Sequence, residues 1–323
     1  MARIIDSTYG HKNQIAKINY LLTNSRFPQS MLFVGPNGIG KKRIALAVAQ
    51  ALVCEVSKEA CGECGPCKRV EKQQSESLFV VQPEGEPGKK QSIKVEAVRD
   101  LLERLSLAPV GKSRVVIIDS AHLMNEQASN AFLKTLEEPS ENLYFILTVT
   151  EAQLLLQTIQ SRVQMMRFPV LEVEHLKAIK PNEPDWAYRS CRGQLDRLEM
   201  LTSKQGLAER QEALQLLHDF CFNDDFLLFD EWRKAMRDDR NWALFNVKCW
   251  LQIVRDAIVL KTQANKFVLN TDQSDFLKQL YALSVPKLNW FAKALLQAAR
   301  DIQGNQDASL VIDSLRVNYA RVD

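Results

Sequence analysis

A glycine-rich turn between an apolar strand and a helix is the feature that most restricts the fold of this chain. Residues 32–52 read LFVGPNGIGKKRIALAVAQAL, with the spacing G-x-x-x-x-G-K. The candidate phosphate-binding residues of this stretch are Gly35, Gly38, Gly40 and Lys41. In this pattern backbone N–H groups close around a phosphate and the lysine meets the terminal phosphates. Because strand, loop and helix follow in the required order, the pattern favours a phosphate-binding loop (P-loop) over a turn that only joins two elements.

The residues that should hold a metal ion and activate water depart from those of hydrolysing P-loop proteins. Lys42 stands where a serine or threonine hydroxyl would coordinate Mg²⁺. Asp119 ends a later apolar run, but Ser120 occupies the place of the glutamate that activates water. These two losses predict that the chain does not hydrolyse ATP alone. Binding of ATP stays open, since the charge of Lys42 can replace part of the charge of the metal.

Four of the seven cysteines lie close together in the sequence. They have the spacing C-x6-C-x2-C-x2-C and are Cys54, Cys61, Cys64 and Cys67. Four thiolates at this spacing suit a closed tetrahedral Zn²⁺ site, which would be structural because no coordination position is left for a substrate. A redox pair or unligated thiols are the alternatives. The other three cysteines lie in apolar helical sequence and are expected to be buried small hydrophobes.

Strand and helix signals alternate in the first half of the chain and only helix signals follow. Apolar runs occur at residues 30–35, 77–83, 113–121 and 142–150, with amphipathic stretches between them. This alternation predicts an α/β fold with a parallel sheet and crossover helices. A composition change near Pro169 and a break at Gly206 are the expected boundaries. The predicted domains are an α/β P-loop core at 1–168 with a cysteine module at 54–67, a small helical domain at 169–206 and a helical C-terminal domain at 207–323.

The composition is that of an ordinary folded protein. The 323 residues are 46% hydrophobic and 25% charged, which is enough apolar material for two or three cores. No run approaches the roughly 18 apolar residues that a membrane crossing needs, and the N-terminus lacks the apolar segment of a signal peptide. A cytoplasmic location is therefore expected. With a net charge of +3, any contact with nucleic acid must rest on local patches.

Four stretches, taken in order, resemble the AAA+ core of bacterial clamp-loader subunits of DNA polymerase III. They are RFPQSMLFVGPNGIGK, the cysteine module, VVIIDSAHLMNEQASNAFLKTLEEPSENLYFILTV and TIQSRVQMMRF. The likeness is close over roughly residues 5–170, and the helical remainder agrees only in character with the lid and collar of that family. The resemblance implies an AAA+ P-loop core with an inserted zinc knuckle, a helical lid and an all-α collar. It also implies other loader subunits as partners, with the sliding clamp and primed DNA contacted through the complex.

The resemblance implies roles for several single residues. Ser161 and Arg162 match the Ser-Arg-Cys motif of the family, with Val163 in place of the cysteine, and the motif arginine reaches the ATP site of a neighbouring subunit. Such a guanidinium stabilises charge on the transferring phosphoryl group. From the local sequence alone, Arg162 is equally a solvated surface arginine. Thr150 matches a polar sensor position, and Arg197 lies where a lid arginine can approach a phosphate, although a plain strand threonine and an exposed helical arginine also fit.

These features leave two main hypotheses for the function. In the first, the chain resembles the delta-prime type of loader subunit, a non-hydrolysing scaffold that gives Arg162 to a neighbouring ATPase subunit while the sliding clamp is loaded onto primed DNA. Lys42 and Ser120 favour this hypothesis. In the second, the chain is an ATP-hydrolysing AAA+ loader subunit, or a self-oligomerising ATPase, with an atypical metal site. A zinc-knuckle nucleic-acid binder is a third hypothesis, but the sequence lacks the accompanying basic and aromatic stripe.

Overall fold

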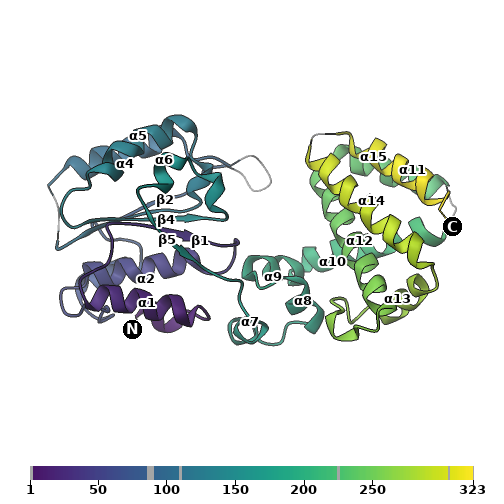
Figure 1. Cartoon of the computed structure of the whole chain (residues 1–323), viewed down its shortest axis with the longest axis horizontal. Helices are drawn as coiled ribbons and strands as arrows, with labels where there is room; N and C mark the ends of the chain where they lie inside the picture. The colour runs from purple at the N-terminus through teal and green to yellow at the C-terminus, as the bar shows by residue number, and fades with distance from the viewer. Residues whose placement is uncertain (1–2, 86–90, 109–110, 224–225, 305, 323) are drawn as a thin grey trace. The chain divides into compact units, whose positions relative to one another are not determined.

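The computed structural model describes residues 3–85, 91–108, 111–223, 226–304 and 306–322 (Figure 1). The chain divides into two compact units. The first comprises Met1–Pro181 and Gly193–Asp196, and the second comprises Asn182–Arg192 and Arg197–Asp323. The boundary between these units falls within residues 169–206, the segment expected to be a helical lid. The three-domain division at 1–168, 169–206 and 207–323 stays a prediction.

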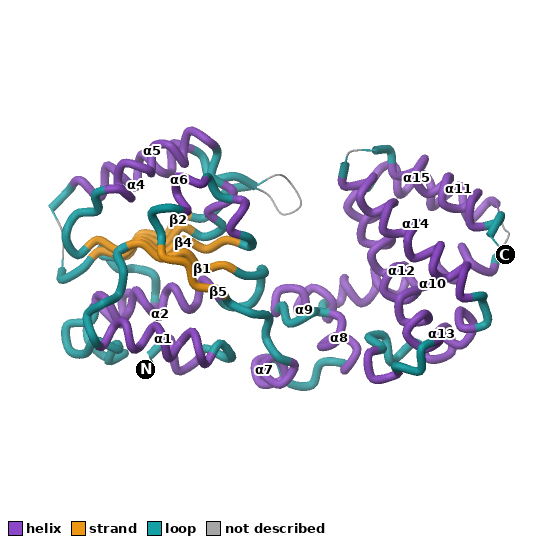
Figure 2. The backbone as a smooth tube through the Cα atoms, viewed as in Figure 1, coloured by secondary structure: helices purple, strands orange, loops and turns teal. Residues whose placement is uncertain are grey.

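The first unit is built around a parallel sheet with the strand order β2-β3-β4-β1-β5. Its strands are β1 (Ser30–Val34), β2 (Leu78–Val81), β3 (Arg114–Ile118), β4 (Leu143–Val149) and β5 (Gln164–Arg167). Its helices are α1 (Lys12–Thr23), α2 (Lys41–Val53), α3 (Gly65–Glu71), α4 (Val95–Ser106), α5 (Glu126–Glu137), α6 (Gln157–Gln160) and α7 (Val173–Ile179), with 3₁₀ turns η1 (Ile4–Ser7), η2 (Ala121–Leu123) and η3 (Ala152–Leu154). Helices α1 and α2 cover one face of the sheet, and α4 and α5 cover the other (Figures 1 and 2). The predicted α/β class with a parallel sheet is confirmed.

Burial explains why four strands could be predicted and the fifth could not. All five residues of β1 are buried, as expected for a continuous apolar run in a strand covered on both faces. By contrast, only Met166 is buried in β5, which lies at one edge of the sheet and begins and ends with polar residues. Its sequence therefore carries neither an apolar run nor an alternating pattern.

Helices α4 and α5 close one face of the sheet with apolar stripes. In α4 the buried positions are Val95, Val98, Leu101 and Leu105, at the spacing of one helical face. In α5 the ring of Phe132 meets that of Phe145 in β4 edge-on, with 5.1 Å between the ring centroids. The Asn125 side chain caps this helix by accepting a hydrogen bond from the Ala128 N–H at 2.8 Å. The cap and the stripe together fix the start and the orientation of α5.

The second unit contains helices and no strand among the residues described. Its helices are α8 (Asp185–Ser190), the greater part of α9 (Leu195–Thr202), α10 (Lys204–Phe222), α11 (Phe226–Asp238), α12 (Arg240–Lys261), α13 (Ser274–Tyr281), α14 (Val285–Gln303) and α15 (Ala308–Tyr319), with the 3₁₀ turn η4 (Asn265–Phe267). Trp250 of α12 is fully buried, and its indole N–H donates to the Ala213 carbonyl at 2.8 Å. Phe220 stacks on Phe291 with centroids 5.5 Å apart. The aromatic residues of this region thus form a bundle core.

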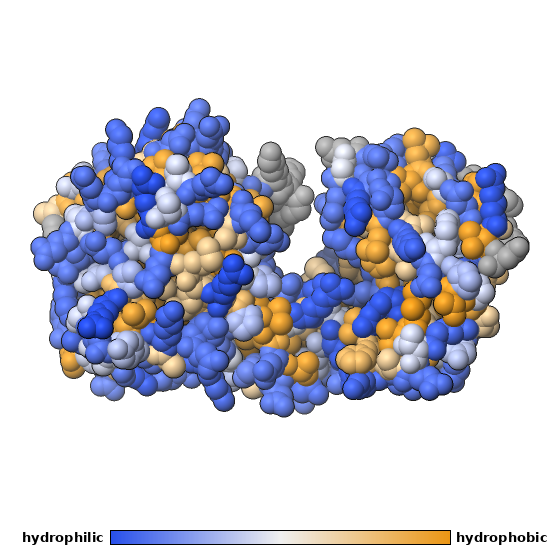
Figure 3. Space-filling view, in the orientation of Figure 1, coloured by the Kyte–Doolittle hydropathy of each residue, from blue (hydrophilic) through white to orange (hydrophobic). Residues whose placement is uncertain are grey.

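The described helices lack membrane-spanning character. None of them has both the length and the hydropathy that a membrane span requires. The face drawn in Figure 3 is mainly hydrophilic, with smaller apolar areas scattered over it. Scattered apolar side chains are normal on a folded surface and do not by themselves mark a binding site.

Candidate functional site

The parallel sheet brings the predicted nucleotide residues to one edge. The P-loop follows β1, Asp119 follows β3 and Thr150 follows β4. Because the strands run in the same direction, their carboxyl ends lie along the same edge, where ligands bind in open α/β sheets. Residues that are far apart in the sequence can therefore belong to one site at this edge.

The P-loop has left-handed backbone at two glycines and encloses its own lysine. Gly38 and Gly40 have φ of +67° and +92°, values that residues with a Cβ rarely adopt. Lys41 is only 7% exposed, and its ammonium group donates to the carbonyls of Gly35 at 2.7 Å and Pro36 at 2.6 Å. Burial lowers the pKa of Lys41 to about 8, against the opposing effect of the Asp119 and Asp196 carboxylates. In this structure the lysine is bound by the loop itself.

Lys42 lies beside the carboxylate predicted to bind a metal ion. Its Nζ is 3.6 Å from Oδ2 of Asp119 and donates to Oε1 of Gln82 at 2.8 Å. The other oxygen of Asp119 accepts a hydrogen bond from the Thr148 hydroxyl at 2.7 Å. The Thr148 oxygen in turn accepts from the Ser120 N–H at 2.9 Å. The Lys42 ammonium group thus lies next to the carboxylate that the sequence predicts as a metal ligand.

Sequence reasoning missed Gln82 and Thr148. It favoured Thr150 on β4, but the sheet register pairs Ile118 with Leu147, so the next residues along, Asp119 and Thr148, become neighbours. Thr148 is 1% exposed and in contact with Asp119, whereas Thr150 is half-buried beyond the strand end. The register that selects between the two threonines is set by pairing of whole strands and leaves no local sequence signal.

The structure joins the two most family-specific stretches of sequence at Arg162. Its Nη2 lies 2.5 Å from Oε1 of Glu137, the last residue of α5, and its Nη1 donates to the Thr158 carbonyl at 2.8 Å and to Ser161 Oγ at 3.1 Å. About a third of the Arg162 side chain is exposed. Within the described residues its hydrogen bonds go to these neighbours and not to the P-loop. Arg162 is therefore oriented on the surface of the first unit.

Of the residues around position 197, the structure brings Asp196 to the P-loop. Asp196 belongs to the first compact unit and Arg197 to the second. The carboxylate of Asp196 lies directly against Gly38, and the Leu195 N–H donates to the Gly38 carbonyl at 2.8 Å. Sequence reasoning singled out the arginine and overlooked the carboxylate next to it. The helical period gave no means of telling which of the two adjacent residues faces the loop.

The four clustered cysteines have the geometry of a metal site. Their Sγ atoms all lie within 4.8 Å of one another, with 4.0 Å between Cys54 and Cys64 and 4.0 Å between Cys61 and Cys67. Tetrahedral Zn²⁺ with Zn–S bonds of about 2.3 Å implies sulfur separations of about 3.8 Å, so the residues fit this ion. N–H groups of Cys64 and Glu63 lower the pKa of the Cys61 thiol to about 6. The same groups favour the thiolate that zinc requires.

A buried glutamine ties the cysteine module to the rest of the first unit. Gln50 of α2 has no exposed surface. Its side-chain amide donates to the Cys67 carbonyl at 3.2 Å and accepts from the Ile4 N–H at 2.9 Å. Cys54 follows directly after α2, and Cys67 lies in α3. The module is thus part of the packed fold and joins α2, α3 and η1.

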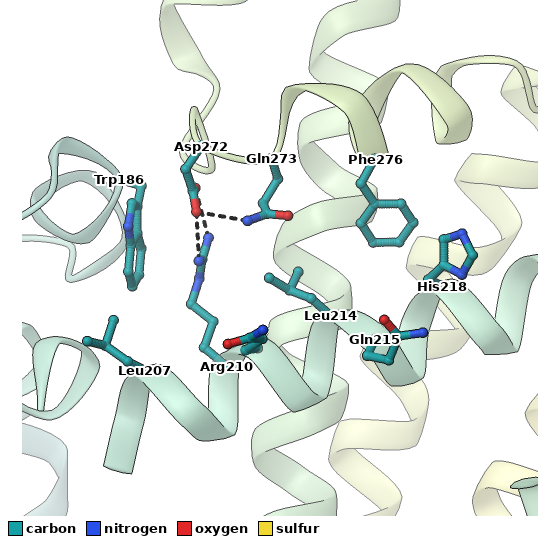
Figure 4. Close-up of a pocket in the computed structure, with 10 residues that line it drawn as sticks. Trp186, Leu207, Arg210, Leu214, Gln215, His218, Asp272, Gln273 and Phe276 are labelled. Atoms are coloured by element: carbon teal, nitrogen blue, oxygen red, sulfur yellow. Dashed lines mark hydrogen bonds and ion pairs between the residues drawn. The ribbon is translucent and has the colours of Figure 1, made fainter. Parts of the chain in front are cut away.

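A separate hollow lies within the second unit (Figure 4) and has a volume of about 500 Å³. At one end the Arg210 guanidinium lies 3.6 Å from the ring centroid of Trp186 and bonds both oxygens of Asp272 at 2.8 and 2.9 Å. It also donates to Asn270 at 3.0 Å. Because its one buried charge is already paired, we assign this hollow to the packing of α8 and α10 against the 270–272 segment. It contains none of the residues predicted to act in catalysis or binding.

Comparisons with known proteins find relatives among the subunits of bacterial DNA polymerase III. The sequence model of the family described as DNA polymerase III, delta subunit, matches residues 10–172, just over half of the chain. DNA polymerase III subunit tau of Escherichia coli K12 is 31% identical over 211 residues, which are 64% of this chain and 29% of that protein. Subunit delta' of Pseudomonas aeruginosa is 36% identical over 160 residues, 47% of this chain and 48% of that protein. The chain thus spans less than a third of the tau subunits that it matches.

A solved structure agrees with the fold. The crystal structure of a gamma-subunit-related protein of DNA polymerase III from Thermotoga maritima has a TM-score of 0.51 at 16% identity, over 95% of this chain and 98% of that one. At this identity the likeness shows the fold alone. The match of the family model over the P-loop core carries the assignment. The chain therefore belongs to the family of AAA+ clamp-loader subunits of bacterial DNA polymerase III.

Proposed function

We propose that the chain is a delta-prime-like subunit that hydrolyses little or no ATP and supplies Arg162 to the ATP site of a neighbouring loader subunit. In this role it takes part in the ATP-driven loading of the sliding clamp onto primed DNA. Its partners are the ATPase subunits and a delta-like subunit, with the clamp and the DNA contacted through the complex. Relatives of both the tau and the delta' kind match the chain, so the choice rests on the chemistry of its own site.

The observation that carries the proposal is the pairing of Lys42 with Asp119 at 3.6 Å. Phosphoryl transfer needs a metal ion that bridges the β- and γ-phosphates and a group that orients the attacking water. In this chain the Lys42 ammonium group lies next to the Asp119 carboxylate, the group expected to bind the metal ion. Ser120, beside it, has no carboxylate to orient water. The alternative of an ATP-hydrolysing subunit requires metal binding next to this fixed positive charge.

Arg162 has two properties that suit an arginine finger, which acts on the ATP site of a neighbouring subunit. It is partly exposed, and contacts to Glu137, Thr158 and Ser161 already order its guanidinium. An arginine that is oriented in advance loses less side-chain entropy when it meets a phosphate. A chain without its own ATPase activity can therefore still contribute to catalysis in a neighbour. The cysteine module, with structural Zn²⁺ held by its four thiolates, would stiffen the same unit.

The test is ATP turnover by a loader reconstituted with its ATPase subunits, the clamp and primed DNA. Arg162→Ala in this chain should lower turnover at the adjacent site by about 10³-fold, and Arg162→Lys should lower it almost as much because a lysine cannot bond the phosphate through two nitrogens. Arg167→Ala, which removes another exposed arginine of the same unit, is the control. Single-turnover measurements isolate the affected site from the intact ones. Equal turnover by the wild-type and Arg162→Ala complexes, with assembly intact, would refute the role in trans.

A further inference from the structure

Arg162 is held by a carboxylate from a different element of the first unit. Oε1 of Glu137, the last residue of α5, lies 2.5 Å from Nη2 of Arg162, which comes shortly after α6. The two residues are 25 positions apart in the sequence. The ion pair therefore connects the end of one helix to the segment that carries the candidate arginine finger.

Both partners of this ion pair stand on backbone that is anchored in the core. Phe132 and Leu136 of α5 and Ile159 of α6 are buried members of one core cluster. The Arg162 N–H donates to the Ile159 carbonyl at 3.0 Å, which ties the backbone of Arg162 to α6. Because the carboxylate and the guanidinium are joined to the same core, their contact fixes the long side chain of Arg162 relative to that core.

The place of Glu137 in its helix offers no other reason for a carboxylate. Negative charges near the C-terminal end of a helix interact unfavourably with the helix dipole. The ion pair is also exposed, with 34% of the Arg162 side chain and 47% of the Glu137 side chain accessible to solvent, and exposed ion pairs contribute little to stability. The contact therefore affects the orientation of Arg162 more than the stability of the fold.

The ion pair leaves part of the guanidinium available. An arginine side chain has five N–H donors. Nη1 donates to the Thr158 carbonyl and to Ser161 Oγ, and Nη2 donates to Glu137. Nε makes no hydrogen bond to the residues that the structure describes. Nε–H and the second N–H of Nη2 can therefore bond an external oxygen anion while Glu137 stays bound.

We infer that Glu137 is a positioning residue for Arg162. It holds the guanidinium in one orientation from within the chain, so that Arg162 meets the ATP of a neighbouring subunit with its remaining donors already aligned. Glu137 itself does not touch the nucleotide. A donor that is oriented in advance loses less entropy on reaching the transition state than one that rotates freely. The inference rests on the proposed function, because it needs Arg162 to act on a neighbouring site.

The experiment compares single-turnover ATP hydrolysis by the reconstituted loader with wild type and Glu137→Ala in this chain. Loss of alignment should lower the rate at the adjacent site by about tenfold, a smaller effect than that of Arg162→Ala, and should leave the ATP affinity of that site unchanged. Glu137→Gln keeps an oxygen that accepts from Nη2 and should recover part of the rate. Glu138→Ala, which removes the neighbouring exposed carboxylate, should match the wild type.

A double variant separates positioning from a general structural effect. In the Arg162→Ala background, Glu137→Ala should cause no further loss, because the side chain that Glu137 positions is gone. An equal further loss in that background would overturn the inference, as would an unchanged rate for Glu137→Ala alone. A faster rate for Glu137→Ala would also overturn it, since Glu137 would then be a latch that withholds Arg162 from the neighbouring site.

The same assay distinguishes this inference from the proposed function. If Arg162→Ala lowers turnover and Glu137→Ala does not, the inference alone is wrong. If Arg162→Ala leaves turnover unchanged, the proposed role in trans is wrong and the inference is wrong with it. Equal melting temperatures of the wild type, Glu137→Ala and Glu138→Ala, expected for an exposed ion pair, exclude unfolding of α5 as the cause of a lower rate.

Discussion

At the scale of single residues, the charged groups of the candidate site contact groups of the same chain. Lys41 is enclosed by loop carbonyls, Lys42 faces Asp119, and Asp196 lies on Gly38. Each pairing is short-range and is made within one compact unit. Restoring a single residue is therefore not expected to restore hydrolysis, because Lys42 and Ser120 occupy the positions of two different groups, the metal ligand and the group that activates water.

The enclosed Lys41 predicts a specific dependence of stability on pH. Its pKa is about 8 in the folded chain and near 10.5 when unfolded. Below pH 8 it is charged in both states. Between pH 8 and 10.5 the unfolded chain binds more protons, so this residue should make the folded chain more stable as pH rises, by at most about 3 kcal/mol. We expect the unfolding free energy of the wild type minus that of Lys41→Met to increase as pH rises from 7 to 10. Unfolding in urea followed by circular dichroism measures both values. A difference that is constant over this range would contradict the prediction.

At the scale of elements, the cysteine module shows how one short segment joins several helices. It connects the end of α2 to α3 and is tied to η1 through Gln50. Because a metal binds the folded arrangement of ligands and stabilises it, loss of zinc should loosen all three elements and not only the loop between them.

Zinc content tests this prediction. The purified wild-type chain should contain about one zinc ion, and Cys64→Ser should lose it because three thiolates remain. Hydrogen exchange should then quicken in residues 54–71 and in the last turn of α2. Cys249→Ser, outside the cluster, should keep its zinc and serves as the control. A Cys64→Ser chain that retains one tightly bound zinc by elemental analysis would argue against the four-thiolate site.

At the scale of the whole molecule, the chain consists of two compact units with separate cores. A buried carboxylate anchors the second core. Asp256 has no exposed surface, pairs with Arg255 at 2.7 Å, and accepts hydrogen bonds from the N–H groups of Leu269 and Asn270 at 3.0 and 2.8 Å. It thereby holds the segment after α12 to the bundle.

Removal of this carboxylate should destabilise the second unit selectively. Asp256→Ala leaves several donors buried without an acceptor and should cost about 3–5 kcal/mol. All five tryptophans lie beyond residue 181, so tryptophan fluorescence reports the unfolding of this unit, and its urea midpoint should fall. Asp275→Ala, which breaks an exposed pair with Lys278, should change it little. Equal midpoints for wild type and Asp256→Ala would count against the anchoring role.

The sequence by itself determined the P-loop, four strands of the sheet, the helical character of the second half and the cysteine cluster. These are local features, since glycine spacing, apolar runs and ligand spacing act within a few turns of chain. The sequence did not predict strand β5, because an edge strand with one buried residue shows neither an apolar run nor an alternating apolar pattern.

Only the tertiary structure decided which distant residues meet. The register of β3 and β4 selected Thr148 over Thr150 as the partner of Asp119. The path of the chain after α8 placed Asp196 on Gly38, and the ends of α5 and α6 brought Glu137 to Arg162. The physical reason is the same in each case: such contacts depend on how whole strands and helices pack, and a shift of one residue changes the partner while the local pattern stays the same.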